Sequence, residues 1–202
     1  MKSSLQLLVF LLLVTTVSCQ KKVNKIKDNK MLYDKIPTTE YNRNMMFYTD
    51  RALPGTTLTE MLENTTIEMK RFITSIPEEK IDHAYSYGKW TIGEVIQHVI
   101  SYEQIMLEVA LLNAGKISEK NHTRYYNQAT TVAGARGKSK NDLLEEFLTV
   151  RKKTQEAFNS LSEEEQKIMG TLDGNKTSVR IIAFCISGHQ VHHFDIIKDR
   201  YL

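Results

Sequence analysis

Half of the histidines in this chain lie within five residues, close to its C-terminal end. The chain has 202 residues and six histidines, and His189, His192 and His193 fall in the segment SGHQVHHFDII. Residues four apart on a helix have Cβ atoms about 5–6 Å apart, so the rings of His189 and His193 can turn toward one point. Neutral imidazole binds divalent cations at about 2.0–2.1 Å. The spacing therefore predicts part of a metal site, which needs at least one further ligand.

Four amphipathic patterns predict the helices that would position these rings. They cover residues 57–76, 90–115, 139–161 and 178–202, with apolar side chains at three- and four-residue spacing. The second pattern has a clear start, because Thr91 and Glu94 form a capping box. We expect an all-α four-helix bundle. The connection over residues 116–138 is long for neighbouring antiparallel helices and favours a topology other than simple up-and-down.

A histidine of the second pattern provides the missing ligand. His98 lies on the apolar stripe of residues 90–115, and His189 and His193 take consecutive positions on the stripe of residues 178–202. His192 is rotated off that stripe by one residue, about 100°. Three histidines with an open fourth position are typical of catalytic zinc sites, and bundle cores commonly hold such sites. We predict that His98, His189 and His193 bind one divalent metal and that His192 does not.

A hydrogen-bonded histidine cluster without a metal is the alternative. HxxxH is by itself a weak motif. However, each buried neutral ring needs partners for both nitrogens, and an unpaired buried polar group costs about 1–3 kcal/mol. The apolar stripes offer few partners apart from Tyr102. The pattern therefore favours a metal.

The other chemically active side chains are weaker candidates. Glu94 and Tyr102 lie closest in sequence to His98 and are the nearest candidates for a general base, although Glu94 is better explained by the capping box. Glu103 and Asp195 are expected to face solvent. Cys185 has no basic neighbour in sequence and is expected to be a small core residue.

The N-terminal residues have the pattern of an export signal. One lysine, an apolar run and small polar residues precede Cys19, and residues 16–19, Thr-Val-Ser-Cys, resemble a bacterial lipobox. Residues 1–19 are thus predicted to be a signal that leaves a lipidated Cys19, with an ordinary cleaved signal as the alternative. Residues 20–55 are predicted to be a tether whose apolar cluster at 45–48 packs partly on the domain. Residues 56–202 form the bundle domain.

These predictions place the protein outside the cytoplasm. A lipidated Cys19 would anchor it to a membrane on the periplasmic or cell-surface side. The formal net charge is only +3, and no basic stripe with interleaved aromatic residues occurs, so nucleic acid is not an expected partner.

Two motifs together resemble the DinB-like superfamily, which includes the YfiT-like proteins and the bacillithiol S-transferases. Trp90 and Thr91 followed by His98 match the family's first motif, and Gly188 with His189 and His193 matches its second. The resemblance covers roughly residues 57–202. It implies a four-helix bundle with up-down-down-up topology, a divalent metal (zinc, nickel or iron) on the three matched histidines, and a homodimer.

The resemblance leaves the reaction open. Members of the family transfer low-molecular-weight thiols, isomerise with a thiol cofactor, or are described as metal-dependent hydrolases. Thiol cosubstrates are cytoplasmic, and the predicted export signal therefore favours a hydrolase acting on an unidentified small molecule over a transferase. A non-catalytic metal- or ligand-binding exported lipoprotein is the alternative, followed by a structural domain with buried histidines and no metal.

Overall fold

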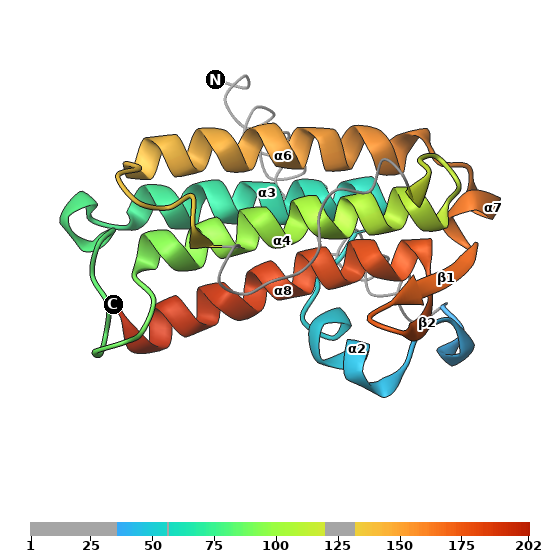
Figure 1. Cartoon of the computed structure of the whole chain (residues 1–202), viewed down its shortest axis with the longest axis horizontal. Helices are drawn as coiled ribbons and strands as arrows, with labels where there is room; N and C mark the ends of the chain where they lie inside the picture. The colour runs from blue at the N-terminus through green and yellow to red at the C-terminus, as the bar shows by residue number, and fades with distance from the viewer. Residues whose placement is uncertain (1–35, 56, 120–131) are drawn as a thin grey trace, which may run out of the picture.

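Four long helices dominate the computed structural model, which describes residues 36–55, 57–119 and 132–202 (Figure 1). They are α3 (Leu58–Ser75), α4 (Ile92–Asn113), α6 (Lys140–Ser160) and α8 (Val179–Arg200). The shorter elements are η1 (Thr38–Glu40), α2 (Arg43–Thr49), η2 (Glu78–Lys80), α7 (Glu163–Gln166), β1 (Met169–Leu172) and β2 (Asn175–Ser178). The predicted four-helix bundle is confirmed, with a two-stranded hairpin as a small addition.

The helices run up-down-down-up, as the resemblance implied. Figure 1 shows α4 and α6 running in one direction and α3 and α8 in the other. Among the four long helices, α4 packs on α6 and α8, and α3 packs on the same two. Parallel α4 and α6 need a connection that crosses the length of the bundle. Residues 120–131 of that connection lie outside the described residues.

Side-chain caps fix where three of the long helices, α3, α4 and α6, begin. Glu94 N–H donates to Thr91 Oγ1 over 3.1 Å, and Thr91 N–H donates to the Glu94 carboxylate over 2.8 Å, which completes the predicted capping box of α4. Ser139 and Asp142 form the same pair at the start of α6. These caps satisfy backbone donors that have no partner within the helix. They therefore fix where His98 falls along α4.

Glu103 is buried, not exposed as the sequence suggested. It is 1% exposed, and both of its carboxylate oxygens accept hydrogen bonds from Arg151 of α6, at 2.7 and 2.8 Å. The Arg151 guanidinium also donates to Gln190 of α8 and to Thr65 of α3. The expectation failed because α4 contacts two helices and so buries two faces. One polar network consequently joins all four helices.

The hairpin β1–β2 was not predicted. Its two strands pair in antiparallel register, with Leu172 opposite Asn175 across a tight turn. The turn residues Asp173 and Gly174 both have positive φ, 50° and 74°. Asp-Gly is a preferred pair for such a two-residue hairpin turn, and its twist matches that of the strands. The hairpin leads directly into α8.

The described part of the predicted tether, residues 36–55, packs on the bundle. α2 lies against α8, and Met45 is buried as part of the apolar cluster expected to pack. Gly188 allows the close approach, because a Cβ at this position would lie 1.7 Å from the carbonyl oxygen of Tyr48. Arg180 of α8 donates to Glu40 over 2.7 Å and holds the segment before α2. Packed structure thus starts by Ile36, before the break at residues 54–55.

Candidate metal centre

The three predicted histidines meet between α4 and α8. The Nε2 atom of His189 lies 3.2 Å from Nε2 of His98 and 3.1 Å from Nε2 of His193. The three ligand atoms all lie within 4.8 Å of one another. A tetrahedral ion with bonds of about 2.0–2.1 Å separates its ligand atoms by roughly 3.3 Å. The arrangement therefore has the dimensions of a ligand set for one ion.

Hydrogen bonds among the rings cannot account for both contacts of the His189 Nε2 atom. The Nε2 atom of His189 faces two other Nε2 atoms, whereas a neutral ring nitrogen either donates one hydrogen bond or accepts one. An N–H···N bond thus accounts for only one of the two contacts. In addition, Nδ1 of His189 is buried with no hydrogen-bond partner among the described residues. The chemistry of this donor set fits a divalent cation bound through Nε2, with Nδ1 carrying the proton.

Burial keeps the three rings neutral, which is the form that binds metals. Desolvation lowers the pKa of His98 to about 4 and that of His193 to about 3. The pKa of His189 falls well below its ordinary value, first because of desolvation and then because of the neighbouring histidines. Metal binding therefore needs no proton release from these rings near neutral pH.

Aromatic side chains hold the rings in place. Tyr102, one turn after His98, stacks on His189 with ring centroids 3.7 Å apart and planes 18° apart. The indole of Trp90 lies 5.0 Å from the ring of His98. Tyr48 of α2 contacts the edge of His189 at 5.3 Å. Rings from three separate segments thus surround the histidines and limit the access of water.

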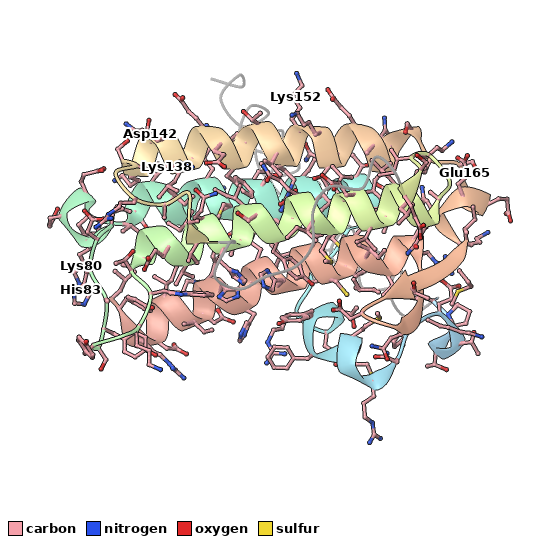
Figure 2. The ribbon with its side chains drawn as sticks, in the orientation of Figure 1. Lys80, His83, Lys138, Asp142, Lys152 and Glu165 are labelled. Atoms are coloured by element: carbon pink, nitrogen blue, oxygen red, sulfur yellow. The ribbon has the colours of Figure 1, made fainter. Side chains whose placement is uncertain are left out.

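The two other histidines among the described residues, His83 and His192, are not part of the cluster. His192 is partly exposed and packs against Phe47 and Tyr48 of α2. Desolvation, followed by the positive charge of Arg51, lowers the pKa of His192. His83 lies in the loop at the end of the bundle (Figure 2). His122 falls outside the described residues.

The two candidate general bases occupy different positions. The Glu94 carboxylate serves the cap of α4 and lines a separate pocket with Asp82 and Gly93. Tyr102 lies within the cluster through its stack on His189. Asp195 is exposed, as expected, and Cys185 is buried, with desolvation raising its thiol pKa to about 12. Of the two, only Tyr102 is placed beside the histidines.

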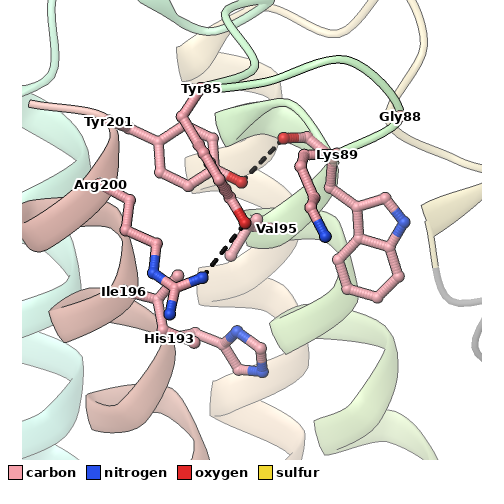
Figure 3. Close-up of a pocket in the computed structure, with 9 residues that line it drawn as sticks. Tyr85, Gly88, Lys89, Val95, His193, Ile196, Arg200 and Tyr201 are labelled. Atoms are coloured by element: carbon pink, nitrogen blue, oxygen red, sulfur yellow. Dashed lines mark hydrogen bonds between the residues drawn. The ribbon is translucent and has the colours of Figure 1, made fainter.

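A pocket of about 530 Å³ opens beside His193 (Figure 3). Its wall includes residues that the sequence did not single out: Tyr85, Gly88, Lys89, Ile196, Arg200 and Tyr201. Arg200 lies seven residues after His193, which places both on one face of α8. That spacing was a readable signal for Arg200. The contribution of the 85–90 loop was not readable, because it depends on how the loop folds over the start of α4.

Comparisons with known proteins agree with this architecture. The chain is similar over 70% of its length, and 82% of the other chain's, to the solved structure of YfiT from Bacillus subtilis, with a TM-score of 0.59 and 14% identity. YfiT is described as a probable metal-dependent hydrolase with an unusual four-helix bundle topology. The likeness shows a shared fold. No curated protein matches the chain.

A comparison of the sequence with protein families identifies the family of this chain. The DinB superfamily pattern matches residues 61–197, which run from Met61 in α3 to Ile197 in α8 and include α4, α6 and all three clustered histidines. The match begins after α2, so α2, whose Tyr48 packs against His189 and His192, lies outside it. This chain belongs to the DinB superfamily.

Proposed function

We propose that His98, His189 and His193 bind one divalent metal and that the protein is a metal-dependent enzyme, of hydrolase type, acting on a small molecule. The observation that carries this is the convergence of three Nε2 atoms from two helices at 3.1–3.2 Å. The similar fold of YfiT, itself described as a probable metal-dependent hydrolase, supports the reaction class. Zinc, nickel and iron all suit imidazole ligands.

The side chains around the cluster have defined roles in this proposal. Three protein ligands leave a fourth position for a substrate or water, and a bound divalent ion supplies Lewis acidity there. Tyr102 fixes the ring plane of His189, and Trp90 covers His98. His193 lines the pocket, which gives a small molecule a path to the cluster. A non-catalytic binding protein would use the same ligands but would not turn over any substrate.

Single histidine substitutions test the ligand set. His98→Ala, His189→Ala and His193→Ala should each reduce metal content, measured by elemental analysis, well below one ion per chain. A metal at 100 times its dissociation constant adds about 2.7 kcal/mol to folding stability. A chelator should therefore lower the melting temperature of the wild-type protein and have little effect on these three variants.

His192→Ala is the matched control, because His192 is adjacent to His193 but faces Phe47 and Tyr48. It should keep the metal and the response to chelator. The proposal is wrong if His98→Ala keeps full occupancy while His192→Ala loses it, since the site would then belong to α8 alone.

We also propose that the protein is exported and anchored through a lipidated Cys19. The lipobox-like residues 16–19 support this location, and they lie outside the described residues. Cys19→Ala should release the protein from the membrane fraction or block its processing. An unchanged fractionation and an unchanged mature N-terminus in this variant would rule the anchor out.

A further inference from the structure

The pocket beside His193 lies at one end of the bundle, where the loop before α4 meets the end of α8. The 85–90 loop before α4 forms one wall, and the last turn of α8 forms the other. The hydroxyl of Tyr201 donates to the carbonyl oxygen of Trp90 over 2.8 Å and joins the two walls. A volume of about 530 Å³ lies within the range of small-molecule sites. The pocket is therefore a formed site next to the histidine cluster.

Its charge has one sign. The nine residues of its wall include two cations, Lys89 and Arg200, and no carboxylate. Figure 3 shows both cationic side chains reaching toward the space beside His193 from different elements. Arg200 Nη1 donates to the hydroxyl of Tyr85 over 3.2 Å, which uses one of the five N–H donors of the guanidinium. Three carboxylates are adjacent in sequence to wall residues: Glu94 is held by the cap of α4, and Asp195 and Asp199 are exposed and are not part of the wall.

Part of the wall is apolar. Val95, Ile196 and Trp90 supply apolar surface to this wall. Such a lining stabilises an apolar ligand body, while a few polar groups fix its orientation. Lys89 and Arg200 are at the exposed rim, where charge attraction is partly screened by solvent.

We infer that the substrate is a small amphipathic organic anion, whose carboxylate or phosphoryl group lies between Lys89 and Arg200. Its apolar body contacts Trp90, Val95 and Ile196, and its reacting bond points toward His193. The statement that this anion reacts beside His193 rests on the proposed function, whereas the statement that it binds in the pocket does not. The anion is recognised by side chains of this chain whether or not a metal is present.

A matched pair of probes tests the inference by calorimetry on the full chain. 3-Phenylpropionate carries the anion, and 3-phenylpropionamide is its neutral counterpart of nearly the same shape. The acid should bind about tenfold more tightly than the amide, before and after treatment with chelator. Lys89→Gln and Arg200→Gln should each weaken binding of the acid about threefold and leave the amide unchanged, because two such effects multiply to the tenfold preference. Benzylphosphonate in place of the acid shows which anionic group is preferred.

Lys198→Gln is the control for general charge loss. Lys198 lies on the same last turns of α8, but its ammonium lies over the ring of Phe72, 5.5 Å from the centroid, and not in the pocket wall. It should leave the affinity for the acid within twofold of wild type. Rising salt should weaken binding of the acid more than binding of the amide.

Several results would overturn the inference. One is an amide that binds as tightly as both anions, and another is the absence of measurable binding of either anion. A third is an acid whose binding needs the metal and ignores Lys89→Gln and Arg200→Gln, because it would then be a metal ligand. Elemental analysis of the same samples separates the two proposals. Wild-type protein that takes up no zinc, nickel or iron when these ions are supplied, but still prefers the acid, contradicts the metal proposal alone.

Discussion

Gly188→Ala should destabilise the protein, although alanine favours helices more than glycine does. Gly188 lies inside α8, where the exchange alone would stabilise by about 1 kcal/mol. A Cβ there, however, would lie 1.7 Å from the carbonyl oxygen and 2.5 Å from the carbonyl carbon of Tyr48. These are backbone atoms that cannot rotate away. α2 must therefore shift from α8, and it carries the Tyr48 ring away from His189.

The expected loss follows from these opposing effects. Overpacking a well-packed contact costs about 1–3 kcal/mol, and detachment of α2 loses the burial of Met45. We expect a net loss of about 1–2 kcal/mol in the free energy of unfolding, measured by urea denaturation. For a domain of this size, 1 kcal/mol corresponds to roughly 2–4 °C in melting temperature.

A truncated chain supplies the decisive comparison. Residues 57–202 lack α2 but retain the whole region that matches the family. In this background Gly188→Ala should raise stability by about 1 kcal/mol, because only the helix preference remains. A full-length variant that melts at or above the wild-type temperature would refute the steric argument. So would a truncated variant that is destabilised as much as the full-length one.

Two further predictions concern buried charge. In chelator-treated protein, the free energy of unfolding should fall as the pH drops below about 6.5. The histidines of the unfolded chain bind protons below that pH, whereas in the folded protein the pKa is about 4 for His98 and about 3 for His193. His98 alone should contribute a loss of about 2 kcal/mol at pH 5, and urea melts that are identical at pH 7 and pH 5 would contradict this. Arg151→Met should cost about 3–5 kcal/mol, because it leaves the buried Glu103 carboxylate without its partner. The double variant with Glu103→Leu should recover most of that loss, and a double variant no more stable than the single one would argue against an unpaired charge as the cause.

The sequence was sufficient to predict the histidine cluster because its signal is local. Four-residue spacing on α8 and a histidine on the apolar stripe of α4 are both visible without coordinates. The caps at Thr91 and Ser139 are also local and place the helices correctly. The relative directions of the helices came from the resemblance and not from the periodicity.

Features that depend on contacts between distant segments were missed. Glu103 looked exposed because one apolar stripe predicts one buried face, whereas α4 has neighbours on two sides. Docking of the short helix α2 depends on a bare backbone at Gly188, which is far along the chain from its partner Tyr48. The hairpin is a different kind of failure, because Asp173-Gly174 is a readable turn signal that was overlooked.

The ion pair between Glu40 and Arg180 attaches the segment before α2 to the first turn of α8. Arg180 is in the first turn of α8, whereas Arg200 and the pocket are at its last turn. A helix of 22 residues is about 33 Å long. The first described element, η1, contacts β2 and thus lies at the end of the bundle remote from the pocket, near the hairpin (Figure 1). A cross-linker or a label attached at η1 is therefore separated from the mouth of the pocket by about the length of α8, and it leaves that mouth uncovered.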